Sequence, residues 1–159
     1  MAETKSKTTL IIEPGKQEVV ASRYFDAPIE KVFSAHIDPE AIKFWWGPAY
    51  LESTIDEFDP TPGGKWKISQ REPSGERYGF HGVYHSVEPS QIVRTFEYEG
   101  VPGHVLMETT RFEEQDGKTL LTAISVYQTL EDRDGMVAAG MESGALESMD
   151  LLAQLVESK

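Results

Sequence analysis

The chain has 159 residues, of which 39% are hydrophobic, and this length and composition predict one globular domain spanning residues 1–159. It contains no cysteine, which excludes disulfides, thiolate nucleophiles and cysteine metal sites. The net charge of −12 disfavours nucleic acid and anionic membrane surfaces as partners. No apolar run approaches the roughly 20 residues of a membrane span, and the N-terminal residues are too polar for a secretory signal. We therefore expect a cytoplasmic protein.

The first third of the chain predicts a flexible tail, two strands and two short helices. The tail covers residues 1–7, the strands cover residues 8–13 and 17–25, and the helices cover residues 28–37 and 40–45. Pro14-Gly15 separates the strands, and Asp26-Ala-Pro28 is a helix-start signal. Asp38-Pro39 begins the second helix and Gly47-Pro48 ends it.

The middle of the chain predicts an antiparallel meander, because strand-like runs alternate with short turns. The runs cover residues 50–58, 64–71, 76–87, 91–98, 104–112 and 118–128. With an earlier strand, the sheet has seven or more members. The segments 79–85 and 120–127 place apolar or aromatic residues on both parities, so the pattern does not assign the inward face of the sheet.

The C-terminal segment, residues 131–157, predicts one long amphipathic helix, because its apolar residues recur at spacings of three and four. Gly140 and Gly144 lie within it, and each glycine inside a helix costs about 1 kcal/mol relative to alanine. Two explanations stay open: a close approach of another segment, or open space beside Met136 and Met141. The bulkier second half of the helix is expected to fill its surroundings.

Six local motifs follow one another along the chain. They are Phe25-Asp-Ala-Pro28, Phe44-Trp-Trp-Gly-Pro48, Pro62-Gly-Gly-Lys-Trp66, Gly82-Val-Tyr-His-Ser-Val-Glu-Pro89, Gly117-Lys-Thr-Leu120 and Gly140-Met-Glu-Ser-Gly144. In this order they resemble the SRPBCC superfamily, and they are most similar to its single-domain heat-shock protein 90 ATPase activator homologue family. The resemblance implies an α+β helix-grip fold of the START and birch-allergen-like type. In that fold a curved antiparallel sheet wraps the long C-terminal helix, two short helices follow the first main strand, and a cavity lies between sheet and helix.

Candidate ligand-binding residues are the aromatic, methionine and hydrogen-bonding side chains around this implied cavity. They are Trp45, Tyr78, Phe80, Tyr84, Phe96, Met107, Thr109, Arg111, Met136 and Met141. Methionine adapts to irregular shapes, while tyrosine combines an apolar ring with one polar tip, and both properties suit a mostly apolar ligand. Ordinary core packing uses the same residue types, so this reading stays open.

Signatures of catalysis and of metal binding are missing. His81 and His85 share a strand face, but they lie roughly 13 Å apart along it and cannot chelate one ion together. The segment Gly140-Met-Glu-Ser-Gly144 is one residue too long for a nucleophile elbow. We predict no catalytic residue, no metal and no cofactor.

Three functions are compatible with these features. The preferred hypothesis is the binding of a small lipophilic or aromatic molecule between the sheet and the C-terminal helix. The first alternative is a protein-interaction or chaperone-accessory module of a stress response, as the resembled family implies. The second is a cyclase or dehydratase-type enzyme using Tyr78, His81, Tyr84 or Arg111. A chaperone partner and a homodimer remain open.

Overall fold

The computed structural model describes residues 7–157. Its elements, in chain order, are β1 (Thr9–Ile11), β2 (Glu18–Phe25), α1 (Ile29–Ser34), α2 (Pro39–Trp45), β3 (Glu52–Phe58), β4 (Lys65–Arg71), β5 (Arg77–Glu88), β6 (Gln91–Tyr98), β7 (Val105–Gln115), β8 (Lys118–Tyr127), α3 (Leu130–Ala138) and α4 (Met141–Glu157). Apart from Lys7, the predicted tail over residues 1–7 lies outside the described residues.

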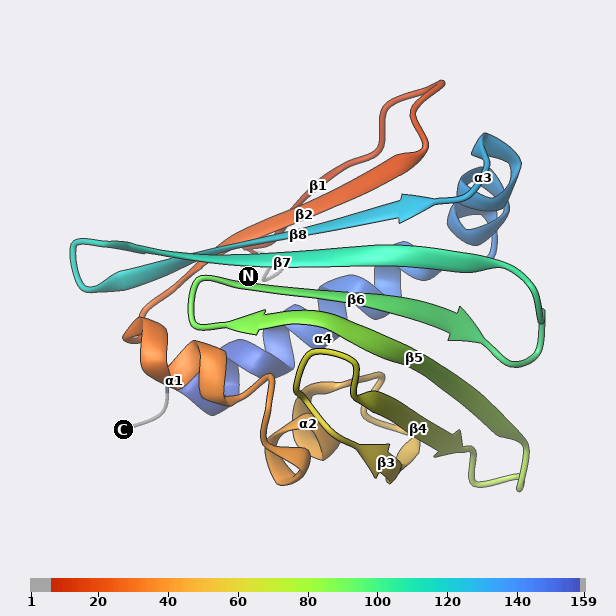
Figure 1. Ribbon diagram of the computed structural model, residues 1–159, viewed down its shortest axis with the longest axis horizontal. Coiled ribbons are helices and arrows are strands. Elements are labelled where there is room, and N and C mark those ends of the chain that lie inside the picture. Colours follow the sequence, from red (N-terminus) through yellow and green to blue (C-terminus); the bar gives the residue numbers. More distant parts are fainter. Residues whose placement is uncertain (1–6, 158–159) are drawn as a thin grey trace, which may run out of the picture.

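The strands form one antiparallel sheet in the order β1-β2-β8-β7-β6-β5-β4-β3. The meander from β3 to β8 is the predicted one, and β2 returns to pair with β8. Figure 1 shows α4 crossing one side of this curved sheet, with α1 and α2 near one end and α3 at the other. The α+β helix-grip architecture is therefore confirmed.

Polar contacts fix both ends of α2. The side chain of Asp38 accepts a hydrogen bond from the Glu40 amide, which caps α2 at its start. Beyond its end, the Gly47 amide donates to Ser148 Oγ at 3.0 Å. Two elements far apart in sequence are thus joined, and the tryptophans at the end of α2 are held against the sheet.

The prediction of a single C-terminal helix over residues 131–157 is wrong, because the helix is interrupted between α3 and α4. Gly140 has a φ of +91°, a left-handed conformation that ends α3 and that glycine adopts without steric cost. An added Cβ at Gly140 or Gly144 would meet nothing within 4 Å. Close packing therefore does not explain either glycine, and the open-space alternative holds.

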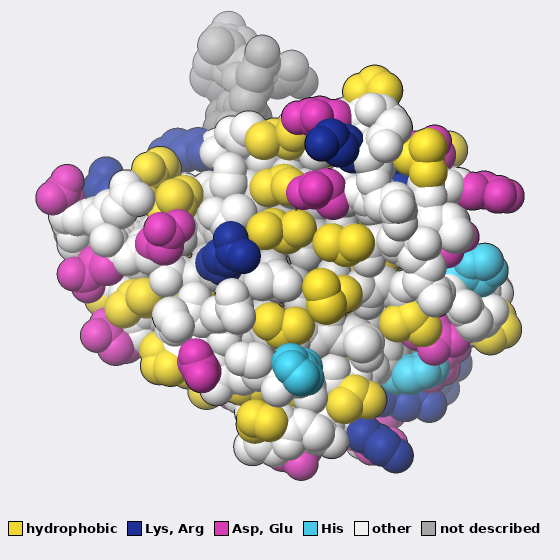
Figure 2. Space-filling view, turned by 45° about the horizontal axis from the view of Figure 1, so that its top comes forward, with side chains coloured by type: hydrophobic (Ala, Val, Ile, Leu, Met, Phe, Trp, Pro, Cys, Tyr) yellow, Lys and Arg dark blue, Asp and Glu magenta, His cyan; other side chains and the backbone are white. Residues whose placement is uncertain are grey.

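The two faces of the sheet differ in burial. The core of the inner face is formed by side chains with at most 1% exposure, among them Phe25, Trp66, Ile68, Leu121 and Leu152. Leu152 belongs to the second half of α4, which is buried as expected. On the outer face, hydrophobic side chains gather in the middle (Figure 2), and Val83, Met107 and Val126 are exposed there. Among residues 7–157, no helix is long and apolar enough to cross a membrane.

Candidate functional site

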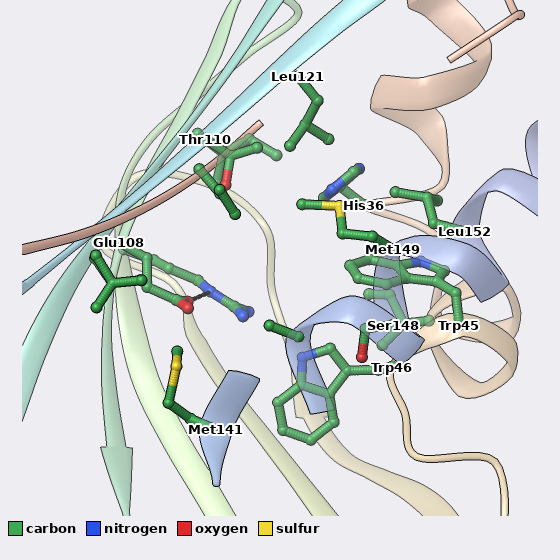
Figure 3. Close-up of a pocket in the computed structure, with 18 of the residues that line it drawn as sticks. His36, Trp45, Trp46, Glu108, Thr110, Leu121, Met141, Ser148, Met149 and Leu152 are labelled. Atoms are coloured by element: carbon green, nitrogen blue, oxygen red, sulfur yellow. Dashed lines mark hydrogen bonds and ion pairs between the residues drawn. The ribbon is translucent and has the colours of Figure 1, made fainter. Parts of the chain in front are cut away.

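A cavity of about 220 Å³ lies between the inner face of the sheet and the first half of α4. We call it the first cavity. Met141, Ala145 and Met149 of α4 form one side, the end of α2 contributes Trp45 and Trp46, and the strands supply the remaining walls (Figure 3). A dry apolar cavity of about 150 Å³ is enough to hold benzene. The first cavity is therefore large enough for a small aromatic group.

An ion pair lies inside this mostly apolar cavity. Arg94 on β6 is directly opposite Glu108 on β7, and Arg94 Nε donates to Glu108 Oε1 at 2.8 Å (Figure 3). The guanidinium carbon lies 3.9 Å from the ring centroid of Trp66. The side chains of Arg94 and Glu108 retain 16% and 28% of their exposure. Since both line the cavity, polar atoms are available to a molecule within it.

The surroundings of Arg94 keep it charged. Burial opposes the cation, but Glu108 and Tyr84 favour it, so that the pKa of Arg94 is raised. Burial also raises the pKa of Tyr84, whose hydroxyl stays neutral. A guanidinium carries five N–H donors, and Glu108 and Tyr84 use only part of this capacity. The site can therefore donate further hydrogen bonds to an acceptor in the cavity.

His36 adds an acceptor to the same cavity. Its Nδ1 lies 2.8 Å from the Val32 carbonyl oxygen, and because a carbonyl only accepts, Nδ1 carries the proton. Burial lowers the pKa of His36 to about 4, and the nearby charge of Arg94 acts in the same direction. The ring is held between Trp45 and Phe112, with centroid distances of 4.8 and 5.0 Å. At neutral pH, Nε2 of His36 is therefore an unprotonated acceptor.

The structure divides the predicted ligand-binding residues into three groups: those that line the first cavity, those that line a second cavity, and those that line neither. Trp45, Tyr84 and Met141 line the first cavity. Phe96 and Met136 line a second cavity, of about 440 Å³, between α3 and the ends of β6, β7 and β8.

The other five predicted residues line neither of these cavities. Tyr78 donates to Glu72, and this hydrogen bond raises the pKa of Tyr78 to about 12. Phe80 packs edge-on against Trp46 at 5.0 Å.

Met107, Thr109 and Arg111 alternate on β7 with the residues that face the cavity. Glu108 and Thr110 line the first cavity, whereas Met107 is 47% exposed. Met107 and Arg111 therefore belong to the outer-facing parity, as does Thr109. The undecided parity of the strands is the reason for this misplacement.

Arg94, Glu108 and His36 were not predicted as site residues. A sequence signal for the pair exists: Arg94 follows Ile92 and precedes Phe96 at the same parity, and Glu108 shares its parity with Leu106 and Phe112. A charge in line with apolar residues on neighbouring strands indicates a buried ion pair. The burial of His36 depends on helix docking and leaves no such signal.

Of the four residues named for the enzyme alternative, Tyr84 lines the first cavity, whereas Tyr78, His81 and Arg111 do not. His81 lies on the outer face and contacts Glu99 at 2.8 Å and Glu97 at 3.4 Å. Within residues 7–157, no group of three or more histidine or acidic side chains could hold a metal ion. The first cavity brings together apolar walls, a cation with spare donors, a carboxylate and a neutral imidazole.

Solved structures confirm the fold. Protein Ms6760 from Mycobacterium smegmatis is 21% identical with a TM-score of 0.85, covering 95% of this chain and 97% of its own. A protein from Arthrobacter aurescens is 22% identical with a TM-score of 0.86, and the match covers 94% of this chain and 91% of that protein's chain. Protein CV1439 from Chromobacterium violaceum is 24% identical with a TM-score of 0.81, covering 90% and 99%.

Sequence comparison identifies the family. No curated protein sequence matches this chain. The profile of the family described as "Activator of Hsp90 ATPase homolog 1-like protein" matches residues 26–157, from just before α1 to the end of α4. This chain therefore belongs to the Activator of Hsp90 ATPase homolog 1-like family.

Proposed function

We propose that this protein binds a small lipophilic or aromatic molecule in the first cavity, between the sheet and α4. The family supports a ligand-binding or Hsp90 co-chaperone-like module in general. The observation that favours ligand binding is an open space of about 220 Å³ that contains the Arg94–Glu108 pair. A buried ion pair is costly to desolvate, and a ligand group that hydrogen-bonds to its spare donors offsets part of that cost.

Apolar burial supplies most of the affinity in this proposal, at roughly 25 cal/mol per Å² of surface removed from water. The indoles of Trp45 and Trp46 offer flat apolar walls, and Met141 and Met149 can adjust to the shape of the ligand. Arg94 then fixes its orientation. The protein acts in the cytoplasm in this proposal and uses no cofactor.

A direct test is native mass spectrometry of the full chain purified from its own host. We expect a retained small molecule that is released on denaturation. Protein that carries no adduct under gentle desolvation, and whose tryptophan fluorescence does not respond to a panel of lipophilic aromatics, would contradict the proposal.

A pair of matched variants places the molecule in the first cavity. Ala145→Phe fills the cavity from α4, whereas Ala138→Phe adds the same ring at an exposed position of α3. We expect Ala145→Phe to lose the retained molecule and Ala138→Phe to keep it, with both variants folded by circular dichroism. Equal retention by both variants would show that the molecule lies elsewhere.

A second candidate function, interaction with a chaperone, is favoured by the exposed apolar side chains of the outer face. Met107 and Val126 are directly opposite each other on β7 and β8, with exposures of 47% and 37%. Such a patch suits a protein partner, and the family name indicates Hsp90. We expect Met107→Lys to abolish capture of the host's Hsp90 if this function operates. No capture by the wild-type chain at tens of micromolar would dismiss this candidate.

A further inference from the structure

The second cavity lies beyond the first along the same three strands. Arg94, Glu108 and Ser125 are paired across β6, β7 and β8, and all three line the first cavity. Phe96, Leu106 and Tyr127 form the next inward row and line the second cavity. Two residues along a strand span about 7 Å. The cavities therefore adjoin, with the ion pair beside their shared boundary.

The side chains at this boundary are adjustable ones. Met141 lines the first cavity and Met136 the second, and both pack against the cluster that contains Leu106 and Tyr127. Methionine has three rotatable bonds and changes shape at little cost. Gly140 lies between them in sequence with open space around it. The two methionines are therefore the side chains at this boundary whose rotation would join the cavities.

The charges at the boundary select the ligand's polar group. Arg94 offers donors and Glu108 offers an acceptor 2.8 Å away, and together the two side chains carry no net charge. A ligand carboxylate here would face Glu108, and an ammonium group would face Arg94, each without a free counter-ion. A neutral group with an acceptor beside a donor, such as an amide, matches both side chains.

The apolar parts of such a ligand have a place on both sides of the pair. The first cavity presents Trp45 and Trp46, which suit an aromatic ring. The second cavity has about twice the volume, at about 440 Å³, and Phe96, Leu106 and Met136 contribute apolar walls.

We infer that the two cavities form one elongated binding site for a neutral amide-like molecule. An aromatic arm lies in the first cavity, an apolar chain lies in the second, and the amide meets Arg94 and Glu108. This inference rests on the proposed function and specifies the class of its ligand.

The test uses benzamide, N-butylbenzamide and N-octylbenzamide as probes, titrated into the full chain by isothermal calorimetry. The ring and the carbonyl are the same in all three probes, and N-butylbenzamide and N-octylbenzamide differ only in the length of the alkyl chain. We expect affinity to rise about fourfold for each buried methylene, the amount that apolar transfer predicts. We also expect 4-octylbenzoate to bind at least tenfold more weakly than 4-octylbenzamide, which differs from it only in carrying a neutral amide in place of the carboxylate.

Two variants at neighbouring positions test where the alkyl chain of the probe lies. Ala139 lines the second cavity and Ala138 does not. We expect Ala139→Phe to reduce the gain in affinity from benzamide to N-octylbenzamide at least tenfold. The affinity for benzamide itself should not change. Ala138→Phe should behave as wild type.

Three results would overturn this inference. The first is equal affinity for benzamide and N-octylbenzamide, and the second is an increase in affinity with alkyl-chain length that is as large in Ala139→Phe as in the wild type. The third is the absence of binding by any probe. None of them decides the proposed function, which stands or falls on the retained molecule and on the Ala145→Phe and Ala138→Phe pair. Failure of the inference and failure of the proposed function are thus distinguishable.

Discussion

Arg94 stacks on Trp66, with its guanidinium carbon 3.9 Å from the ring centroid. Trp66 is itself fixed, because its Nε1 donates to the Thr95 carbonyl oxygen at 3.1 Å. A desolvated cation–π contact of this kind contributes about 2 kcal/mol. The indole face and Glu108 together hold the cation at a defined place in the cavity.

Removal of only one member of the ion pair should be strongly destabilising. Glu108→Leu leaves the Arg94 cation in the interior without its carboxylate, at an expected cost of about 3–5 kcal/mol in the free energy of unfolding. Urea titration measures this cost. The double variant Arg94→Leu/Glu108→Leu should be less destabilised than Glu108→Leu.

The matched control for this prediction is Glu113→Leu, at an exposed position of the same strand. It should change the unfolding free energy by no more than about 0.5 kcal/mol. A double variant less stable than Glu108→Leu would show that the packing of the Arg94 side chain, rather than an unpaired charge, determines the stability lost in Glu108→Leu.

His36 should make the protein sensitive to acid. Its pKa is about 4 in the folded state against 6.5 unfolded, so the unfolded state binds more protons between these values. The stability that His36 contributes is complete above pH 6.5 and is lost as the pH falls toward 4. Between pH 7 and pH 5 the expected loss is about 2 kcal/mol.

This loss is measured as the difference between urea unfolding free energies at pH 7 and pH 5. In His36→Gln it should shrink by about 2 kcal/mol, whereas the exposed His85→Gln should keep the wild-type difference. Identical pH dependence in all three proteins would contradict the buried, neutral state of His36.

The two glycines near the start of α4 should respond oppositely to alanine. Gly140 has a φ of +91°, and an alanine in the left-handed region costs about 1–2 kcal/mol. Gly144 lies within α4 with open space around it, so Gly144→Ala should stabilise by about 0.5–1 kcal/mol. Thermal unfolding compares the two variants directly. Equal shifts would mean that the helix continues through Gly140.

Gly82 marks a close approach of β5 to β6. A Cβ there would collide with the Thr95 carbonyl and come within 2.7 Å of Trp66 Nε1, which breaks the hydrogen bond between these groups. We expect Gly82→Ala to cost about 2–3 kcal/mol in urea unfolding. Gly135→Ala, with nothing within 4 Å, is the control and should not destabilise. A neutral effect at Gly82 would require the strands to separate without cost.

The order of the elements could be predicted from sequence because local signals fix it. Pro14-Gly15 turns the chain between β1 and β2, and Asp38 caps α2 through its own side chain. The break at Gly140 was missed, since apolar spacing continues across it and only the backbone conformation interrupts the helix.

The face of each strand could not be predicted for a physical reason. A bulge between Tyr84 and Ser86 shifts the alternation within β5, and the outer face has apolar residues of its own, such as Val83. Arg111 was therefore named as a candidate hydrogen-bonding group without an assigned face, and Arg94 was not named. The family resemblance implied a cavity between sheet and helix, but no local pattern records its position or lining, because unfilled space depends on how α3 and α4 dock.

The break between α3 and α4 gives each cavity a cover with its own attachment. Arg133 of α3 donates to the Glu13 carbonyl oxygen at 2.8 Å, and Asp132 accepts from His104. α4 is attached elsewhere, through Ser148 to Gly47. A substitution in one cover can therefore leave the shape of the other unchanged.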